Sequence, residues 1–165
     1  MELLVVIAIV TIVAAFAYPS LTQWRANSIL NSSARQLFGD FQRAKMEAVH
    51  RNADVVLKFT KGTSTSSGGS YTMFVDTNAN GSLDSGESVI TTVTMPKGVD
   101  LYQTALVNKS GTSVTYYGYN SQGWAVDFVD GGVSLKNDNS HYYKASLTGA
   151  GSVKLQQSSD GSTWN

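Results

Sequence analysis

The opening of the chain constrains its fold more than any other feature. Between Leu3 and Tyr18 every residue is apolar except Thr11, and Glu2 is the only charged residue before Pro19. A carboxylate at the end of an apolar helix costs free energy unless an opposite charge neutralises it. We therefore expect Glu2 to pair with a cation from a second copy of the helix, which would make this helix an assembly element as well as an anchor.

Three interpretations of the apolar run differ in the length and flanks that they require. A bilayer-spanning helix needs about 20 residues, and about three further residues upstream would bring the run to that length. A cleaved signal peptide needs a basic start and a cleavage site of small residues. Residues 14–17, Ala-Ala-Phe-Ala, resemble such a site, but the start is not basic. A core helix of a soluble protein is the third interpretation, and we favour the membrane anchor.

The helix is predicted to continue beyond the apolar run. Six apolar residues recur at alternating spacings of four and three, namely Leu30, Ala34, Leu37, Phe41, Ala44 and Ala48. This spacing places them on one face of a helix, where they would pack against a sheet of the same chain. The charged Arg43 and Glu47 lie off this face and form a predicted i,i+4 pair.

The predicted helix runs from Glu2 to about Arg51, with a kink at Pro19 because proline lacks the backbone N–H and its ring clashes with the preceding turn. Such a helix would be about 75 Å long at about 1.5 Å per residue. We divide the chain into a transmembrane or assembly helix over residues 1–24 and a globular domain over residues 25–165, which includes the amphipathic second half of the helix.

After Asn52 the hydrophobic pattern changes from a helical period to the alternation of strands. Residues 61–70 are rich in Gly, Ser and Thr and are predicted to form a flexible loop, and Asp130–Gly131 is predicted to be a hairpin turn. Strands are predicted over 55–59, 71–75, 89–95, 114–117, 124–129, 133–136, 142–147 and 153–156. One long helix followed by antiparallel strands is an α+β fold.

Composition and motifs argue against several functional classes. Twelve basic residues balance twelve acidic ones, so the net charge gives no support to nucleic-acid binding, and the absence of cysteine excludes disulfides and thiolate chemistry. His50 and His141 are the only histidines, and neither belongs to a metal-protease motif. No nucleophile-elbow or phosphate-binding glycine motif is present. We therefore expect no enzymatic activity.

Residues 76–87 match the spacing of a calcium-binding loop, Asp-x-Asn-x-Asn-Gly with a closing Glu. The candidate ligands are Asp76, Asn78, Asn80, Ser82 through its carbonyl group, Asp84 through a water molecule, and Glu87 through both carboxylate oxygens. The flanking segments are predicted strands, so this is not a helix–loop–helix EF-hand. Asn, Asp and Gly are also common in polar turns, and the sequence leaves both a Ca²⁺ site and a plain turn open.

The start Met-Glu-Leu-Leu-Val-Val-Ile-Ala-Ile-Val, followed by Pro19, resembles the N-terminal signature of type IV pilins and pseudopilins. Residues 35–57, the stretch from Tyr71 to Glu87 and the C-terminal Tyr-Tyr-Lys-Ala-Ser-Leu-Thr-Gly-Ala-Gly segment resemble the GspH/FimT branch of pseudopilins and minor pilins. In this family a basic leader is cleaved, and the Glu is thought to meet the methylated N-terminal amine of a neighbouring subunit. The resemblance implies that the leader and about three mature residues precede Met1.

The resemblance also implies partners and a location. These are other pilin or pseudopilin subunits, membrane lipid before assembly, and an assembly platform in the bacterial inner membrane. The chain would cross this membrane once before entering a periplasmic pseudopilus, as in type II secretion, or an extracellular filament. Some relatives bind DNA through a basic C-terminal element, but this chain has no positive charge after Lys154, so DNA is not an expected partner.

Two functional classes follow from the sequence. The first is a structural subunit of a type IV pilus-like filament, most simply a GspH/FimT-type pseudopilin or pilin. The second is a binding module at the filament tip that contacts a secreted substrate, a glycan or DNA. Neighbouring genes of a secretion or pilus operon would distinguish the systems.

Overall fold

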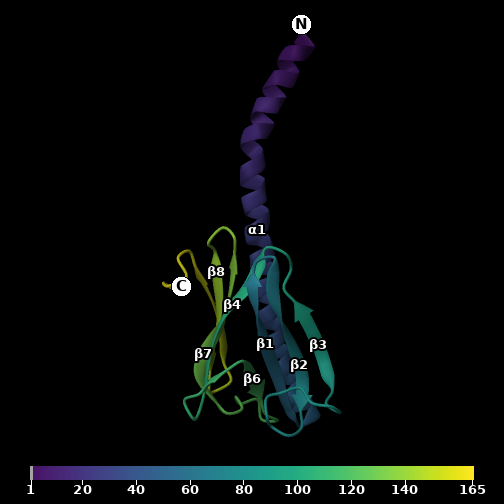
Figure 1. Cartoon of the computed structure of the whole chain (residues 1–165), viewed down its shortest axis with the longest axis vertical. Coiled ribbons are helices and arrows are strands. Elements are labelled where there is room, and N and C mark those ends of the chain that lie inside the picture. Colours follow the sequence, from purple (N-terminus) through teal and green to yellow (C-terminus); the bar gives the residue numbers. More distant parts are fainter. Residues whose placement is uncertain (1) are drawn as a thin grey trace.

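A single long helix, α1 (Glu2–Arg51), begins the chain and runs into the β domain. The computed structural model describes residues 2–165, except for the side chains of residues 4, 8, 10, 12–17 and 19. The N-terminal half of α1 projects beyond the domain, whereas the C-terminal half lies along the strands (Figure 1). The predicted helix from Glu2 to about Arg51 is therefore confirmed.

The predicted apolar face of α1 forms one wall of the core. Its members are Leu30, Ala34, Leu37, Phe41, Ala44 and Ala48, and each is at most 1% exposed. The predicted pairing of Glu47 with Arg43 is wrong. Glu47 instead forms a 2.7 Å ion pair with Arg51, one turn later, although the charge of Arg43 still helps to lower the pKa of Glu47.

The β domain contains two antiparallel sheets, as the predicted α+β class requires. The first has the order β3-β2-β1-β6, and the second has the order β5-β4-β7-β8-β9. The strands are β1 (Asp54–Ser64), β2 (Ser67–Asp76), β3 (Val89–Thr94), β4 (Val99–Asn108), β5 (Ser113–Val114), β6 (Tyr116–Tyr119), β7 (Phe128–Asn137), β8 (Tyr142–Thr148) and β9 (Val153–Ser158).

Aromatic rings join the helix to both sheets. Tyr117 in β6 makes edge-to-face contacts with Phe41 of α1 and with Phe128 of β7, at ring-centroid distances of 5.8 and 4.6 Å. Such contacts favour a fixed geometry in addition to the burial of apolar area. Helix α1 also contacts β1 of the first sheet and β8 and β9 of the second, so strands of both sheets hold it.

The predicted flexible loop at residues 61–70 is wrong. Strand β1 extends to Ser64 and β2 begins at Ser67, so the connection between them is short. Gly68 is needed for packing here, because a Cβ atom at this position would lie 2.0 Å from the carbonyl oxygen of Val99. The glycines of this segment therefore permit close approach of β1 and β2 to β4, a role that composition alone does not distinguish from flexibility.

The predicted strand over 124–129 is correct only for Phe128 and Val129, which begin β7, and the predicted turn at Asp130–Gly131 is wrong. Both Asp130 and Gly131 lie inside β7, where Asp130 pairs with Val107 on one side and Thr148 on the other. A Cβ atom at Gly131 would lie 2.1 Å from the carbonyl oxygen of Ala105. Close backbone approach, rather than a turn, accounts for this glycine. Strand β4, between Val99 and Asn108, was not predicted.

Candidate functional site

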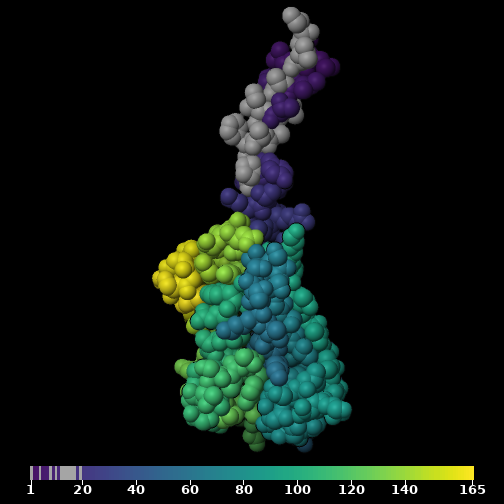
Figure 2. All heavy atoms as spheres, in the orientation of Figure 1, coloured from purple at the N-terminus to yellow at the C-terminus, as the bar shows by residue number. Residues whose placement is uncertain are grey.

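The N-terminal half of α1 exposes large hydrophobic side chains that no strand covers. Leu3 is 73% exposed and Tyr18 is 71% exposed. Six further side chains of this half are exposed in the same way, namely Val5, Val6, Ile7, Ile9, Leu21 and Trp24. Figure 2 shows this part of the helix standing clear of the β domain. An apolar surface of this kind is a contact surface for another molecule.

Glu2 lies in the first turn of α1 and is exposed. Within the described part of the chain it forms no salt bridge, because the two ion pairs there join Arg51 to Glu47 and Lys136 to Asp100. The helix continues through position 19, but the side chain of Pro19 lies outside the described residues, so the kink predicted there stays a prediction. No helix in the described residues combines the length and hydropathy of a membrane span.

The candidate calcium loop connects β2 to β3. It begins at Asp76, which is 4% exposed and accepts hydrogen bonds from the backbone N–H groups of Gly81 at 2.7 Å and Asn80 at 3.3 Å. Gly81 has a φ of 69°, and a Cβ atom there would lie 2.4 Å from the ring of Tyr116. The sharp turn that the sequence predicted at this glycine is therefore present.

The other acidic residues of the loop are held in their charged form. The side-chain amides of Asn78 and Asn80 donate to Oδ2 of Asp84 at 2.8 and 2.6 Å and lower its pKa. Oε2 of Glu87 accepts from the N–H of Asp84 and Oε1 accepts from the N–H of Thr77, both at 2.9 Å, which lowers the pKa of Glu87. Hydrogen bonds to a carboxylate favour ionisation.

The structure therefore brings together most of the predicted ligands, but as a hydrogen-bonded turn. Ser82 differs, because its hydroxyl accepts from Nζ of Lys58 at 3.2 Å. Among the described residues, no three acidic, histidine or cysteine side chains are arranged to hold a metal ion together. A Ca²⁺ ion would require the amides of Asn78 and Asn80 to turn their oxygens inward and Glu87 to release the two backbone N–H groups.

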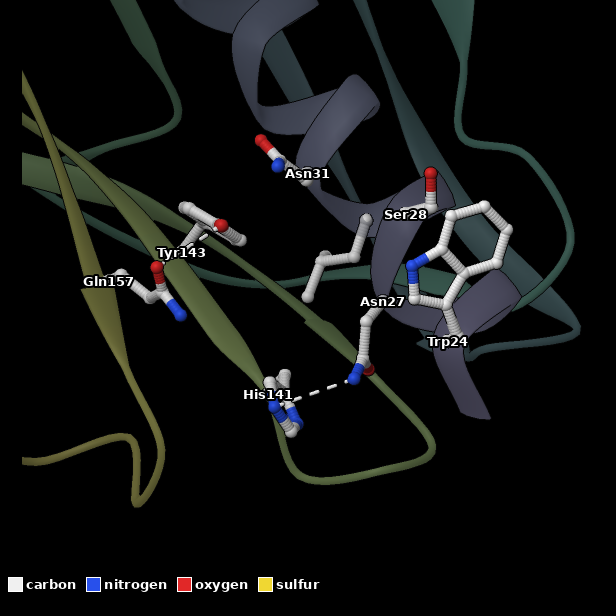
Figure 3. A pocket seen from close by; sticks show the side chains of 8 residues that line it. Trp24, Asn27, Ser28, Asn31, His141, Tyr143 and Gln157 are labelled. Atoms are coloured by element: carbon white, nitrogen blue, oxygen red, sulfur yellow. Dashed lines mark hydrogen bonds between the residues drawn. The ribbon is translucent and has the colours of Figure 1, made fainter. Parts of the chain in front are cut away.

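A polar pocket that sequence reasoning missed lies between α1 and the β8–β9 hairpin (Figure 3). Its volume is about 320 Å³. Its main lining residues are Trp24, Asn27, Asn31, His141, Tyr143 and Gln157. The lining residues from α1 and those from the β8–β9 hairpin are far apart in the sequence, and no local pattern connects them. Two aromatic lining residues could have given a signal in the sequence, Trp24, which lies off the predicted buried face, and Tyr143.

Comparisons with known proteins agree with this architecture. The family model described as type II transport protein GspH matches residues 33–152. The pilin-like protein PilA1 of Thermus thermophilus is 41% identical over 88 residues, which are 53% of this chain and 52% of that protein. The match thus spans about half the length of this curated relative.

Two crystal forms of the type IV minor pilin FimU of Pseudomonas aeruginosa have the same fold. They superpose with TM-scores of 0.52 and 0.53, at 18% identity and over 82% of this chain, and cover 97% and 92% of the FimU chains. With the family match, these structures confirm the pilin-like resemblance drawn from the sequence and the helix-plus-sheet fold that it implies.

Proposed function

Because this chain belongs to the GspH family of type II transport proteins, we propose that it is a non-enzymatic structural subunit of a type IV pilus-like filament. The exposed apolar half of α1 is the observation that carries the proposal. Burial of apolar area contributes about 25 cal/mol per Å², so side chains such as Leu3 and Ile9 favour contact with helices of neighbouring subunits. The β domain, which buries its own core, would lie on the outside of the filament.

The same surface supports a membrane-bound stage before assembly. In this proposal the N-terminal half of α1 lies in the inner membrane in contact with lipid, and an assembly platform then moves it into the filament core. The filament is either a periplasmic pseudopilus or an extracellular pilus. Lipid and neighbouring helices are both apolar surroundings, so one surface serves both stages.

Glu2 gives the proposal its direct test. In a helix bundle surrounded by apolar groups, the Glu2 carboxylate would pair with a cation of the neighbouring subunit. We expect Glu2→Ala and Glu2→Gln to reduce incorporation into filaments at least about tenfold, because about 1.4 kcal/mol of lost pairing already changes an equilibrium tenfold. Glu47→Ala, which removes a partly exposed carboxylate and its ion pair with Arg51 from the globular half, is the matched control. Normal filament number and length with Glu2→Ala would refute the pairing.

A second candidate function is Ca²⁺ binding by the loop from Asp76 to Glu87. Two observations favour it: the spacing of the oxygen-bearing side chains and the positive φ of Gly81 at the sixth position of the loop. Asp76, Asn78, Asn80, Asp84 and Glu87 would supply side-chain oxygens, and Ser82 would supply its carbonyl oxygen. The bound ion would neutralise three carboxylates and tie the β2–β3 connection.

A further inference from the structure

We propose that the pocket between α1 and the β8–β9 hairpin binds a neutral carbohydrate, a function beyond filament assembly. No Asp, Glu, Lys or Arg lines this pocket. A phosphate, a carboxylate or an amine would therefore find no opposite charge there. Leu30, which is fully buried, is the only aliphatic lining residue, so an acyl chain or an apolar helix would find little to contact.

One wall of the pocket is held by a series of hydrogen bonds, which determine how the side-chain amides of Asn137 and Asn27 are oriented. Oδ1 of Asn137 accepts from the backbone N–H groups of Asn139 and His141, so its amide nitrogen must donate, and it donates to Oδ1 of Asn27 at 2.8 Å. Nδ2 of Asn27 then faces Nε2 of His141 at 3.5 Å, while Nδ1 of His141 lies 3.1 Å from the carbonyl oxygen of Asn139.

These hydrogen bonds orient the side chains of the wall. When Nδ1 of His141 donates to the carbonyl oxygen of Asn139, Nε2 can accept from Nδ2 of Asn27. The polar groups of the wall are therefore oriented before a ligand arrives. A site whose polar groups are already oriented loses less conformational entropy on binding.

The opposite side of the pocket offers hydrogen-bond donors without protein partners. Nε of Arg35 donates to Oδ1 of Asn31, and the hydroxyl of Tyr143 donates to Oε1 of Gln157, so the amide nitrogens of Asn31 and Gln157 point elsewhere. No residue in the described part of the chain accepts from either nitrogen or from Nε1 of Trp24. N–H donors of this kind around one pocket match the hydroxyl and ring oxygens of a sugar.

Trp24 supplies the apolar surface that a sugar ring also needs. Its side chain is 67% exposed at the edge of the pocket, and Figure 3 shows its ring nitrogen turned toward the other lining side chains. An indole combines a broad apolar face with one N–H donor, as a pyranose combines C–H faces with hydroxyl groups. The volume of about 320 Å³ lies at the small end of ligand pockets, which range from about 300 to 1,000 Å³, and this favours a mono- or disaccharide.

The test uses the full chain, labelled with ¹⁵N, in micelles of a detergent that has no sugar headgroup. Glucose, galactose, N-acetylglucosamine and lactose are titrated in turn, and the indole N–H signals are followed by NMR. The chain has three tryptophans, so Trp124 and Trp164 serve as internal references. We expect at least one saccharide to shift the Trp24 signal saturably, with a Kd on the order of 1 mM, while the other two signals stay unchanged.

Variants separate this pocket from general surface effects. Trp24→Ala and Gln157→Ala should weaken binding at least about tenfold, whereas Trp124→Ala, which removes another exposed tryptophan outside the pocket, should leave it unchanged. Circular dichroism checks that each variant is folded. The proposal is overturned if no neutral saccharide gives a saturable shift, if Trp24→Ala binds as tightly as the unsubstituted chain, or if charged glucosamine binds as well as its neutral counterpart. Filament incorporation is scored separately, so failure here leaves the structural role intact.

Discussion

The hydroxyl of Tyr71 in β2 donates a 2.6 Å hydrogen bond to Oδ2 of Asp40 in α1. This bond ties the helix to the first sheet beside the buried ring of Phe59, which lies 6.0 Å from the ring of Tyr71. Tyr71 is 1% exposed, and burial followed by the hydrogen bond to Asp40 raises the pKa of its hydroxyl. The link is therefore a polar contact at the border of an otherwise apolar interface.

Tyr71→Phe should destabilise the domain without disturbing its packing, because the ring stays and only the hydroxyl is lost. A hydrogen bond to a charged group contributes about 1.5–3 kcal/mol, so we expect the free energy of unfolding to fall by about that amount. Urea unfolding at neutral pH measures it. Tyr143→Phe is the control, because that hydroxyl makes an exposed 3.3 Å hydrogen bond to Gln157. Equal effects of the two substitutions would contradict the proposed role of Tyr71.

The buried tyrosines also predict the response to alkaline pH. Burial raises the pKa of Tyr117 to about 12 and raises that of Tyr119 as well, whereas an unfolded tyrosine titrates near pH 10. A raised pKa means that the folded state holds the proton more tightly. This contribution to stability is complete below about pH 10 and is lost as the pH rises through about 12.

We therefore expect the free energy of unfolding to decrease above about pH 10, with the buried tyrosines contributing tyrosinate absorbance only as the domain unfolds. Denaturant unfolding between pH 8 and 12, followed by absorbance and circular dichroism together, tests this. If tyrosinate absorbance rose fully at about pH 10 while the domain stayed folded, burial would not be protecting these hydroxyl groups.

The loop from Asp76 to Glu87 predicts a response to Ca²⁺. If the ion binds only the folded state, a hundredfold excess over Kd stabilises it by about 2.7 kcal/mol, and a Kd of about 10⁻⁴ to 10⁻³ M is typical of extracellular modules. Millimolar Ca²⁺ should then raise the melting temperature relative to EDTA, and Glu87→Ala should remove this difference. Identical melting curves in Ca²⁺ and EDTA would leave the loop as a turn.

The two halves of α1 should behave differently in solution. The full chain, with side chains such as Leu3 and Tyr18 exposed, should require detergent or form polymers. A fragment that begins at Arg25 keeps the buried face of α1 from Leu30 to Ala48 and should be a soluble monomer. Sedimentation velocity compares the two, and a monodisperse, detergent-free monomer of the full chain would show that the apolar half needs no partner.

The sequence by itself determined the features that depend on local periodicity. The buried face of the helix from Leu30 to Ala48 follows from a 3.6-residue repeat that is visible in the chain, and its exposed apolar half follows from the continuous apolar run that begins at Leu3. Most strand positions follow in the same way from alternation. The turn at Gly81 was also readable, because this glycine occupies the turn position of the Asp-x-Asn-x-Asn-Gly motif and glycine easily adopts a positive φ.

Only the tertiary structure decided the features that depend on residues far apart in the chain. Gly68 and Gly131 are sites of close backbone approach to β4 rather than marks of a loop and a turn, since the neighbour that requires them is distant in sequence. The hydrogen bond between Tyr71 and Asp40 joins a strand to a helix. The pocket likewise exists only because folding places His141 beside Asn27, and no local pattern encodes such a meeting.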